Sequence, residues 1–351
     1  MDAIIEKWND FFIRKGIDKT LREKYVDYIK VLVKNNVPII FDFNHLRLLM
    51  GRSDLYFASV INSPENHYRS FKLKKRSGGF REILAPYPAL LEMQYWIYGN
   101  ILKKIPISSY CHGFACKKSI ITNARIHLNQ KELLKLDLKD FFPSIKINRI
   151  IYVFKSLGYT NQVAFYLASL CSYEGALPQG APTSPYLSNI IAKQLDKRLI
   201  GLSQRYNLRY TRYADDLTFS GDSIPTKLLE YINEIVNSEG FTINLDKTRL
   251  YKKGGKRIVT GISVIGNELK LPKDYKRNLR QELHFIIKYG YESHIKKKKI
   301  RKVNYLDILL GKVNFWLSIE PSNKFALNAR SQLLEIHKKY NFCLLYTSDA
   351  A

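Results

Sequence analysis

The chain has 351 residues, 57 of them Lys or Arg against 31 Asp or Glu, and a formal net charge of +26 at pH 7. Hydrophobic residues make up 46% of the sequence, which excludes a disordered chain. No apolar run approaches the roughly 20 residues that span a bilayer, and the N-terminus lacks the order of a signal peptide. We therefore expect a cytoplasmic protein with no membrane partner. The positive charge predicts a polyanionic partner that is bound in a salt-dependent way.

The first third of the chain predicts helices and then a basic hairpin. Residues 1–36 and 44–61 have apolar residues at helical spacing, and we assign 1–65 to an N-terminal helical region. The stretch 71–83 has two strand-like runs around a Ser-Gly-Gly turn, which predicts a hairpin. Its cations, among them Lys74 and Arg81, suit it to bind phosphates. A long helix is expected next, from Pro86 to Ile105.

Two short patterns follow that are weak on their own. Asn123 and His127 are four residues apart, on one face if this segment is helical, but such a pair often serves only the core or a helix cap. Cys111 and Cys116 flank a His-Gly-Phe-Ala stretch, yet no second Cys/His pair completes the four ligands of a structural zinc site. We expect free thiols instead.

A strand and a rigid loop then supply candidate site residues. Residues 131–138 alternate between leucines and polar residues, which predicts a half-buried strand that delivers Asp137 to a cleft. The Pro/Gly-rich loop 175–185 holds Gln179 where it can line a substrate site. We expect Ser184 to cap a helix that carries an apolar stripe as far as Leu199.

A second hairpin is predicted at residues 209–221, with Asp215 and Asp216 at its tip. Taken alone, two Asp residues in a turn are as consistent with local hydrogen bonding as with chemistry. Further strands are expected at 241–245 and within 256–264. Beyond Pro272 the sequence predicts basic helices.

Asp137, Asp215 and Asp216 together indicate a site. Three carboxylates that converge in a strongly basic protein predict bound cations, and Mg²⁺ prefers such oxygen ligands. Two Mg²⁺ ions can stabilise the attacking and leaving oxygens of an in-line phosphoryl transfer. The residues therefore predict a nucleotidyl-transfer site.

At this point the sequence resembles the reverse transcriptase family. Tyr213-Ala214-Asp215-Asp216 matches its Tyr-x-Asp-Asp box, 137–142 resembles its first catalytic motif and 177–185 its Gln-Gly loop, in the family's order. The resemblance implies an α+β, right-hand polymerase fold, with fingers, a palm whose antiparallel sheet carries the catalytic hairpin, and a helical thumb. The implied domains are fingers at 66–135, palm at 136–265 with a fingers insertion at about 145–178, and a basic thumb at 266–342.

The resemblance also implies roles for single residues. Asp137, Asp215 and Asp216 would be catalytic and hold two Mg²⁺ ions, and Lys74 and Arg81 would bind the triphosphate of a dNTP substrate.

Three further residues would act on the nucleotide. Gln179 would meet the incoming nucleotide and the template. Phe142 would be the steric gate that excludes a 2′-hydroxyl, although an aromatic ring at this position could also be core. Lys247 would lie near the leaving pyrophosphate and act as its proton donor.

Two further boxes narrow the resemblance to bacterial retron reverse transcriptases. They are Asn123-Ala124-x-x-His127 and Val259-Thr260-Gly261, and we assign Asn123, His127, Val259, Thr260 and Gly261 to RNA binding. The implied activity is copying part of a structured noncoding RNA of msr-msd type into single-stranded DNA (msDNA), primed from an RNA 2′-hydroxyl. Implied partners are that RNA, an effector protein in anti-phage defence, and a host ribonuclease H, since the chain after Gly261 is too short to contain one.

Two alternatives stay open. The chain could be another bacterial reverse transcriptase, from an intron, a diversity-generating element or an abortive-infection system. It could also be a degenerate polymerase fold kept as an RNA-binding scaffold, against which the intact catalytic residues argue. The last residues, 343–351, resemble a translated sequencing adapter, so we expect the native chain to end at or beyond Phe342.

Overall fold

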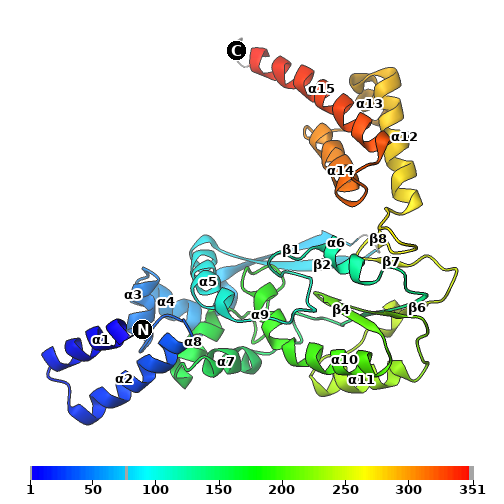
Figure 1. Cartoon of the computed structure of the whole chain (residues 1–351). Coiled ribbons are helices and arrows are strands. Elements are labelled where there is room, and N and C mark those ends of the chain that lie inside the picture. Colours follow the sequence, from blue (N-terminus) through cyan, green and yellow to red (C-terminus); the bar gives the residue numbers. More distant parts are fainter. Residues whose placement is uncertain (1, 76–77, 348–351) are drawn as a thin grey trace. The chain divides into compact units, whose positions relative to one another are not determined.

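The computed structural model describes residues 2–75 and 78–347 and divides into two compact units (Figure 1). The first unit comprises Met1–Lys117, Lys135–Thr218 and Pro225–Arg249. The second comprises Lys118–Leu134, Phe219–Ile224 and Leu250–Ala351. The end of the expected adapter-derived tail, residues 348–351, lies outside the described residues.

Helices make up most of the first unit. They are α1 (Asp2–Arg14), α2 (Lys19–Lys34), α3 (Phe43–Leu49), α4 (Asp54–Asn62), α5 (Pro88–Asn100), α7 (Ile147–Ser156), α8 (Asn161–Leu170), α9 (Ser184–Ile191), α10 (Lys193–Arg205) and α11 (Leu228–Ser238), with short 3₁₀ helices η1 (Pro64–His67), η2 (Leu102–Lys104) and η3 (Leu245–Lys247).

The N-terminal helical stretch is confirmed, with a break that the periodicity did not show. Gly16 takes φ +67° between α1 and α2, and the Asp18 carboxylate accepts hydrogen bonds from the backbone of Thr20 and Leu21 at the start of α2. An Asp at this position supplies acceptors for amides that have no partner inside the helix.

The basic hairpin is confirmed. Strands β1 (Tyr68–Lys74) and β2 (Phe80–Pro86) pair antiparallel, with Leu73 opposite Arg81. Two residues near its tip, 76 and 77, lie outside the described residues.

A four-stranded sheet carries the second hairpin, which is also confirmed. Its strand order is β4-β5-β3-β6, with bounds β3 (Glu132–Asp137), β4 (Arg209–Tyr213), β5 (Asp216–Gly221) and β6 (Arg249–Tyr251). Because β5 lies next to β3, the end of β3 at Asp137 lies beside the β4–β5 turn. Helix α10 packs against β4 and against α11 (Figure 1).

Two sequence-based expectations in this region were wrong in detail. The expected strand 241–245 forms only one bridge pair, Leu138 with Ile243, because the chain turns into η3 immediately afterwards. The helix expected from Ser184 to Leu199 is two helices, α9 and α10, separated at Ala192, and its N-cap is Thr183.

The second unit combines one short helix from the middle of the chain with the C-terminal helices. Its helices are α6 (Ile120–Ile126), α12 (Lys273–Tyr289), α13 (Tyr291–Lys298), α14 (Tyr305–Ile319) and α15 (Lys324–Thr347). Ala124 of α6, Val259, and residues of α12 and α14 such as Leu283 and Trp316 belong to one buried core. Among the described residues no helix has the length and apolar character to cross a bilayer.

Strands β7 (Ile258–Val259) and β8 (Ile262–Ser263) of the second unit form a minimal hairpin. Its two turn residues, Thr260 and Gly261, both take positive φ, +46° and +84°. This pattern is typical of a tight hairpin turn, in which Gly is readily accommodated and a β-branched Thr is strained.

Candidate active site

A cleft of about 690 Å³ lies in the first unit and brings predicted site residues together. Its walls come from the β1–β2 hairpin, the chain after β3, the loop before α9 and the β4–β5 turn. The predicted residues that line it are Arg81, Asp137, Phe142, Gln179, Asp215 and Lys247. Six predicted residues, most of them far apart in the sequence, therefore line one cleft.

Asp137 ends β3 and is held from two directions. Its backbone carbonyl accepts from Asn244 N at 2.8 Å. Its carboxylate oxygens accept from Lys247 Nζ at 2.8 and 2.9 Å. This hydrogen bond to Asp137 raises the pKa of Lys247, so the Lys247 ammonium stays protonated at neutral pH.

Asp215 lies in the β4–β5 turn, and Asp216 is the first residue of β5. The preceding residue, Ala214, takes φ +56°, and Asp215 O accepts from Leu138 N at 2.9 Å. This bond joins the turn to the chain just after Asp137.

The carboxyl groups of the turn have raised pKa values. Burial and then the charge of Asp137 raise the pKa of Asp215. Burial and then the charge of Asp215 raise the pKa of Asp216 to about 6, with Asp137 adding to the effect. Asp216 is not among the residues that line the cleft, but it directly follows Asp215 at the start of β5.

The donor set fits a hard divalent cation in its chemistry. Carboxylate oxygens are the ligands that Mg²⁺ prefers, and mutual repulsion between acids is relieved by a cation. In the described part of the chain, however, no group of three or more His, Cys, Asp or Glu side chains is already arranged around one point. The Asp137 carboxylate is instead engaged by the Lys247 ammonium.

The basic hairpin and the Gln179 loop are joined. Leu84 N on β2 donates to Gln179 O at 2.8 Å. Gly180 takes φ +135°, and a Cβ at this position would come within 2.6 Å of Leu84 O, so a side chain has no room. Arg81 lines the cleft from this hairpin. Lys74 is exposed at the end of β1, opposite Phe80, and it is Lys75 that lines the cleft.

Phe142 is half-buried and lines the cleft, so it is not a core residue. Its ring centroid lies 5.5 Å from that of Phe141 and 6.3 Å from that of Phe114. Phe114 also lines the cleft, with 46% of its surface exposed. Phe114 was not predicted from the sequence to lie at the nucleotide site, because a Phe after Gly is usually an ordinary loop or core residue.

The residues assigned to RNA binding lie in the second unit, and three of them are buried. Asn123, His127 and Val259 are 1%, 0% and 0% exposed. The His127 ring is 2.7 Å from Ser220 Oγ. Thr260 Oγ1 donates to the carbonyl of the first residue of α6 at 3.1 Å. Their assignment stays a prediction, in which the buried side chains would shape an RNA-binding surface rather than touch RNA.

Comparison with known proteins defines the class. The profile of the family "Reverse transcriptase (RNA-dependent DNA polymerase)" matches residues 73–307, a stretch that contains every predicted site residue. The chain belongs to this family. The predicted fold class, a mixed helix-and-sheet reverse transcriptase fold, is confirmed.

Curated proteins that match this chain include retron enzymes. The chain is 40% identical to the Retron Mx65 reverse transcriptase of Myxococcus xanthus over 240 residues, covering 62% of this chain and 56% of that protein. It is 36% identical to the Retron Ec86 reverse transcriptase of Escherichia coli over 231 residues, covering 65% of this chain and 72% of that protein. It is 34% identical to the Retron Mx162 reverse transcriptase of Myxococcus xanthus, covering 77% of this chain and 61% of that protein. Within its family the chain is thus a retron-type reverse transcriptase, although it spans less than two thirds of either Myxococcus relative.

Proposed function

We propose that this chain is the RNA-directed DNA polymerase of a retron. The observation that carries the proposal is the convergence of Asp137, Asp215, Gln179 and Arg81 on one cleft. This arrangement combines acids for a metal with a cation and an amide for a nucleotide. It argues against a non-catalytic scaffold, which would have no need for the acids.

Asp137, Asp215 and Asp216 would hold two Mg²⁺ ions. When bound, these ions neutralise charge on the reacting phosphate and on the attacking and leaving oxygens. The raised pKa values of Asp215 and Asp216 support this role, because the site favours added positive charge.

Lys247 would change partners during the reaction. It pairs with Asp137 at 2.8 Å, and a cation bound by the same carboxylate would compete with this ion pair. The Lys247 side chain is 59% exposed, and the released ammonium would be available to donate a proton to the pyrophosphate. Arg81, with Lys74 or Lys75, would bind the triphosphate of the incoming dNTP.

Phe142 would select the sugar. Its ring lies in the cleft that also contains Asp137 and Gln179, and an aromatic ring beside the 2′ carbon leaves no room for a hydroxyl. Phe114 and Phe141 lie against it and would limit its motion. This supports deoxynucleotides as the substrates.

The RNA partner follows from the retron relatives and from the charge. We infer that the chain copies part of a structured noncoding RNA of msr-msd type into msDNA, starting from an RNA 2′-hydroxyl. The basic C-terminal helices, together with the surface around the Val259-Thr260-Gly261 turn, would bind that RNA through its phosphates and shape. We further propose that the protein acts in anti-phage defence together with an effector protein. Host ribonuclease H would remove the RNA template from the product, and the protein would be cytoplasmic.

The decisive experiment is reverse transcription by the purified chain. We expect DNA synthesis when it is incubated with its neighbouring noncoding RNA, dNTPs and Mg²⁺. The first nucleotide should be joined through a 2′,5′ bond, which debranching enzyme cleaves and nuclease P1 leaves intact. Synthesis from an added DNA primer only, with no product from the RNA, would favour a different bacterial reverse transcriptase. No synthesis with either would support the scaffold alternative.

A further inference from the structure

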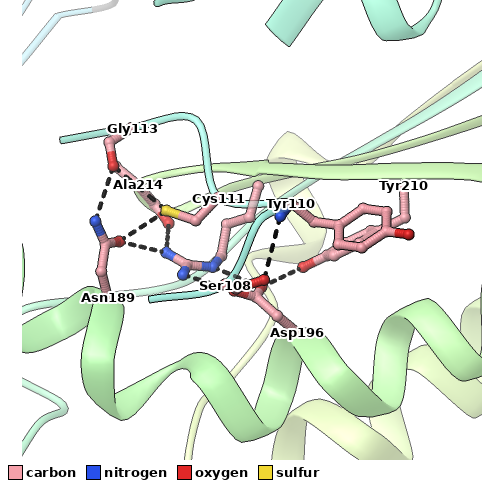
Figure 2. A network of polar contacts seen from close by, with 9 residues as sticks. Ser108, Tyr110, Cys111, Gly113, Asn189, Asp196, Tyr210 and Ala214 are labelled. Carbon is pink, nitrogen blue, oxygen red and sulfur yellow. Dashed lines mark hydrogen bonds and ion pairs between the residues drawn. The ribbon is translucent and has the colours of Figure 1, made fainter. Parts of the chain in front are cut away.

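A buried polar network lies against the turn that carries Asp215, and none of the roles proposed above uses it. Figure 2 shows it running between α9, α10 and the start of the catalytic hairpin. At its centre are Arg212 and Asp196, whose side chains are both 0% exposed. Arg212 Nε and Nη2 donate to the two carboxylate oxygens of Asp196, each at 2.8 Å. Burial alone would lower the pKa of Arg212, but the Asp196 carboxylate and its hydrogen bonds raise this pKa by more. The guanidinium therefore stays charged.

The third guanidinium nitrogen reaches the turn. Arg212 Nη1 donates to Ala214 O at 3.1 Å and to Asn189 Oδ1 at 3.0 Å. Ala214 O belongs to the peptide bond whose nitrogen is that of Asp215. With φ +56°, Ala214 takes a left-handed conformation that is unfavourable for a residue with a Cβ, so the turn depends on outside support.

A separate segment closes the network from the other side. Asn189 Nδ2 donates to Gly113 O at 2.9 Å, and His112 N donates to Arg212 O at 2.7 Å. Gly113 packs so tightly that a Cβ there would lie 2.4 Å from Ala214 N. The turn is thus held by a hydrogen bond on its carbonyl side and by close packing on its amide side.

We propose that Arg212, fixed by Asp196 and Asn189, is a positioning residue for nucleotidyl transfer. It fixes the Ala214 peptide and thereby the direction in which Asp215 presents its carboxylate to the cleft. The proposal rests on the polymerase function inferred above. A buried ion pair is weak evidence for stability, because the loss of hydration offsets much of the attraction. The fork of bonds from one guanidinium to Asp196, Asn189 and Ala214 is better explained by a need for defined geometry.

Arg212→Lys tests this geometry most directly. Lys keeps the positive charge beside Asp196, but its single ammonium cannot reproduce the planar fork that reaches Asp196 and Ala214 together. The turn should then shift. A displacement of about 1 Å at a catalytic group can reduce the rate on the order of 100-fold. Asn189→Ala is the milder second variant, since it leaves the Arg212–Asp196 pair in place and removes the amide that joins Arg212 Nη1 to Gly113 O.

The control is Val163→Ala, a core truncation in α8 of the same unit at a side chain that is 0% exposed. It should lower stability without touching the network. Each full-length variant is assayed for thermal unfolding, RNA affinity, single-nucleotide incorporation and Mn²⁺ binding by electron paramagnetic resonance. For Arg212→Lys we expect kcat to fall about 10- to 100-fold, with the dNTP KM changed less than about threefold, because the turn moves while the nucleotide pocket stays. Mn²⁺ binding should weaken about tenfold, since one ligand is misdirected.

Asn189→Ala should show a smaller change in the same direction, and Val163→Ala should keep the wild-type kcat and Mn²⁺ affinity. A folded Arg212→Lys protein with wild-type kcat and Mn²⁺ affinity would overturn the proposal. So would an equal loss of activity in Val163→Ala, or failure of both network variants to fold, which would make the network purely structural. If the wild type itself incorporates no nucleotide, the proposed function fails, while Mn²⁺ binding still tests whether Arg212 positions Asp215.

Discussion

The ionised Asp216 carboxylate should destabilise the folded protein when no metal is bound, and replacing Asp216 with Asn should raise the free energy of unfolding. Its pKa is raised from 3.8 to about 6, chiefly by burial and by the charge of Asp215. A difference of about 2 pKa units corresponds to about 3 kcal/mol of unfolding free energy at pH values above both pKa values. Because Asp216 is partly exposed, solvent screening reduces this, and we expect about 1–3 kcal/mol.

The pH dependence follows from the direction of the shift. The folded protein binds a proton at Asp216 more tightly than the unfolded chain does, so stability falls as pH rises from about 4 to about 6. In EDTA at pH 8, Asp216→Asn should therefore be more stable than wild type by about 1–3 kcal/mol. At pH 5 about half of that difference should remain.

The difference in unfolding free energy between wild type and Asp216→Asn is measured by urea unfolding at pH 8 and pH 5, in EDTA and in Mg²⁺. Mg²⁺ should stabilise wild type more than Asp216→Asn, because a ligand stabilises only a protein that binds it. Asp246→Asn is the matched control, since Asp246 is exposed in the same unit and its change should have little effect at either pH. The reasoning is refuted if Asp216→Asn is no more stable than wild type at pH 8, or if the difference does not shrink at pH 5.

Four further outcomes are expected. Asp215→Asn should lower DNA synthesis on the order of 10³-fold or more while leaving RNA affinity in filter binding nearly unchanged, because only a metal ligand is lost; persistent DNA synthesis would contradict the assignment. Phe142→Val should admit ribonucleotides in primer extension, and unchanged sugar discrimination would return Phe142 to a packing role. RNA affinity should fall about 10³-fold between 50 and 200 mM salt if six or more phosphates are contacted, whereas a flat dependence would assign the +26 charge to another task. Gly113→Ala should lower kcat or folding yield because its methyl group would strike Ala214 N, and wild-type behaviour would show that the turn tolerates displacement.

The positions of the three candidate acids could be predicted because their sequence signals are local. Alternating leucines placed Asp137 on the polar side of a strand, and strand-like runs on both sides of Asp215 and Asp216 predicted a hairpin. The structure has both elements, and the pairing of β5 with β3 brings them together. The sequence could not show that Lys247 engages Asp137, since those residues meet only through tertiary structure.

The Arg212–Asp196 pair was not predicted for a related reason. Charged residues are mostly exposed in proteins, so the sequence predicts surface positions both for Asp196, within an amphipathic helix, and for Arg212, on a strand. Asp196 lies on α10 and Arg212 on β4, and their complete burial reflects the packing of these two elements, which has no local signature. For residues 241–245 the local signal was present but the tertiary partner was not. The stretch has β-propensity, yet it forms only one bridge pair, between Ile243 and Leu138.

The hydrogen bond between Leu84 and Gln179 limits how this protein can change over evolutionary time. It ties the register of β2 to the loop that carries Gln179, and at Gly180 this loop lies so close to Leu84 that a side chain would not fit between them. Since side chains alternate along a strand, losing one residue between Arg81 and Leu84 would turn Arg81 to the opposite face of the hairpin. We therefore expect insertions and deletions to be excluded between Arg81 and Leu84 and to be tolerated only at the tip of the hairpin.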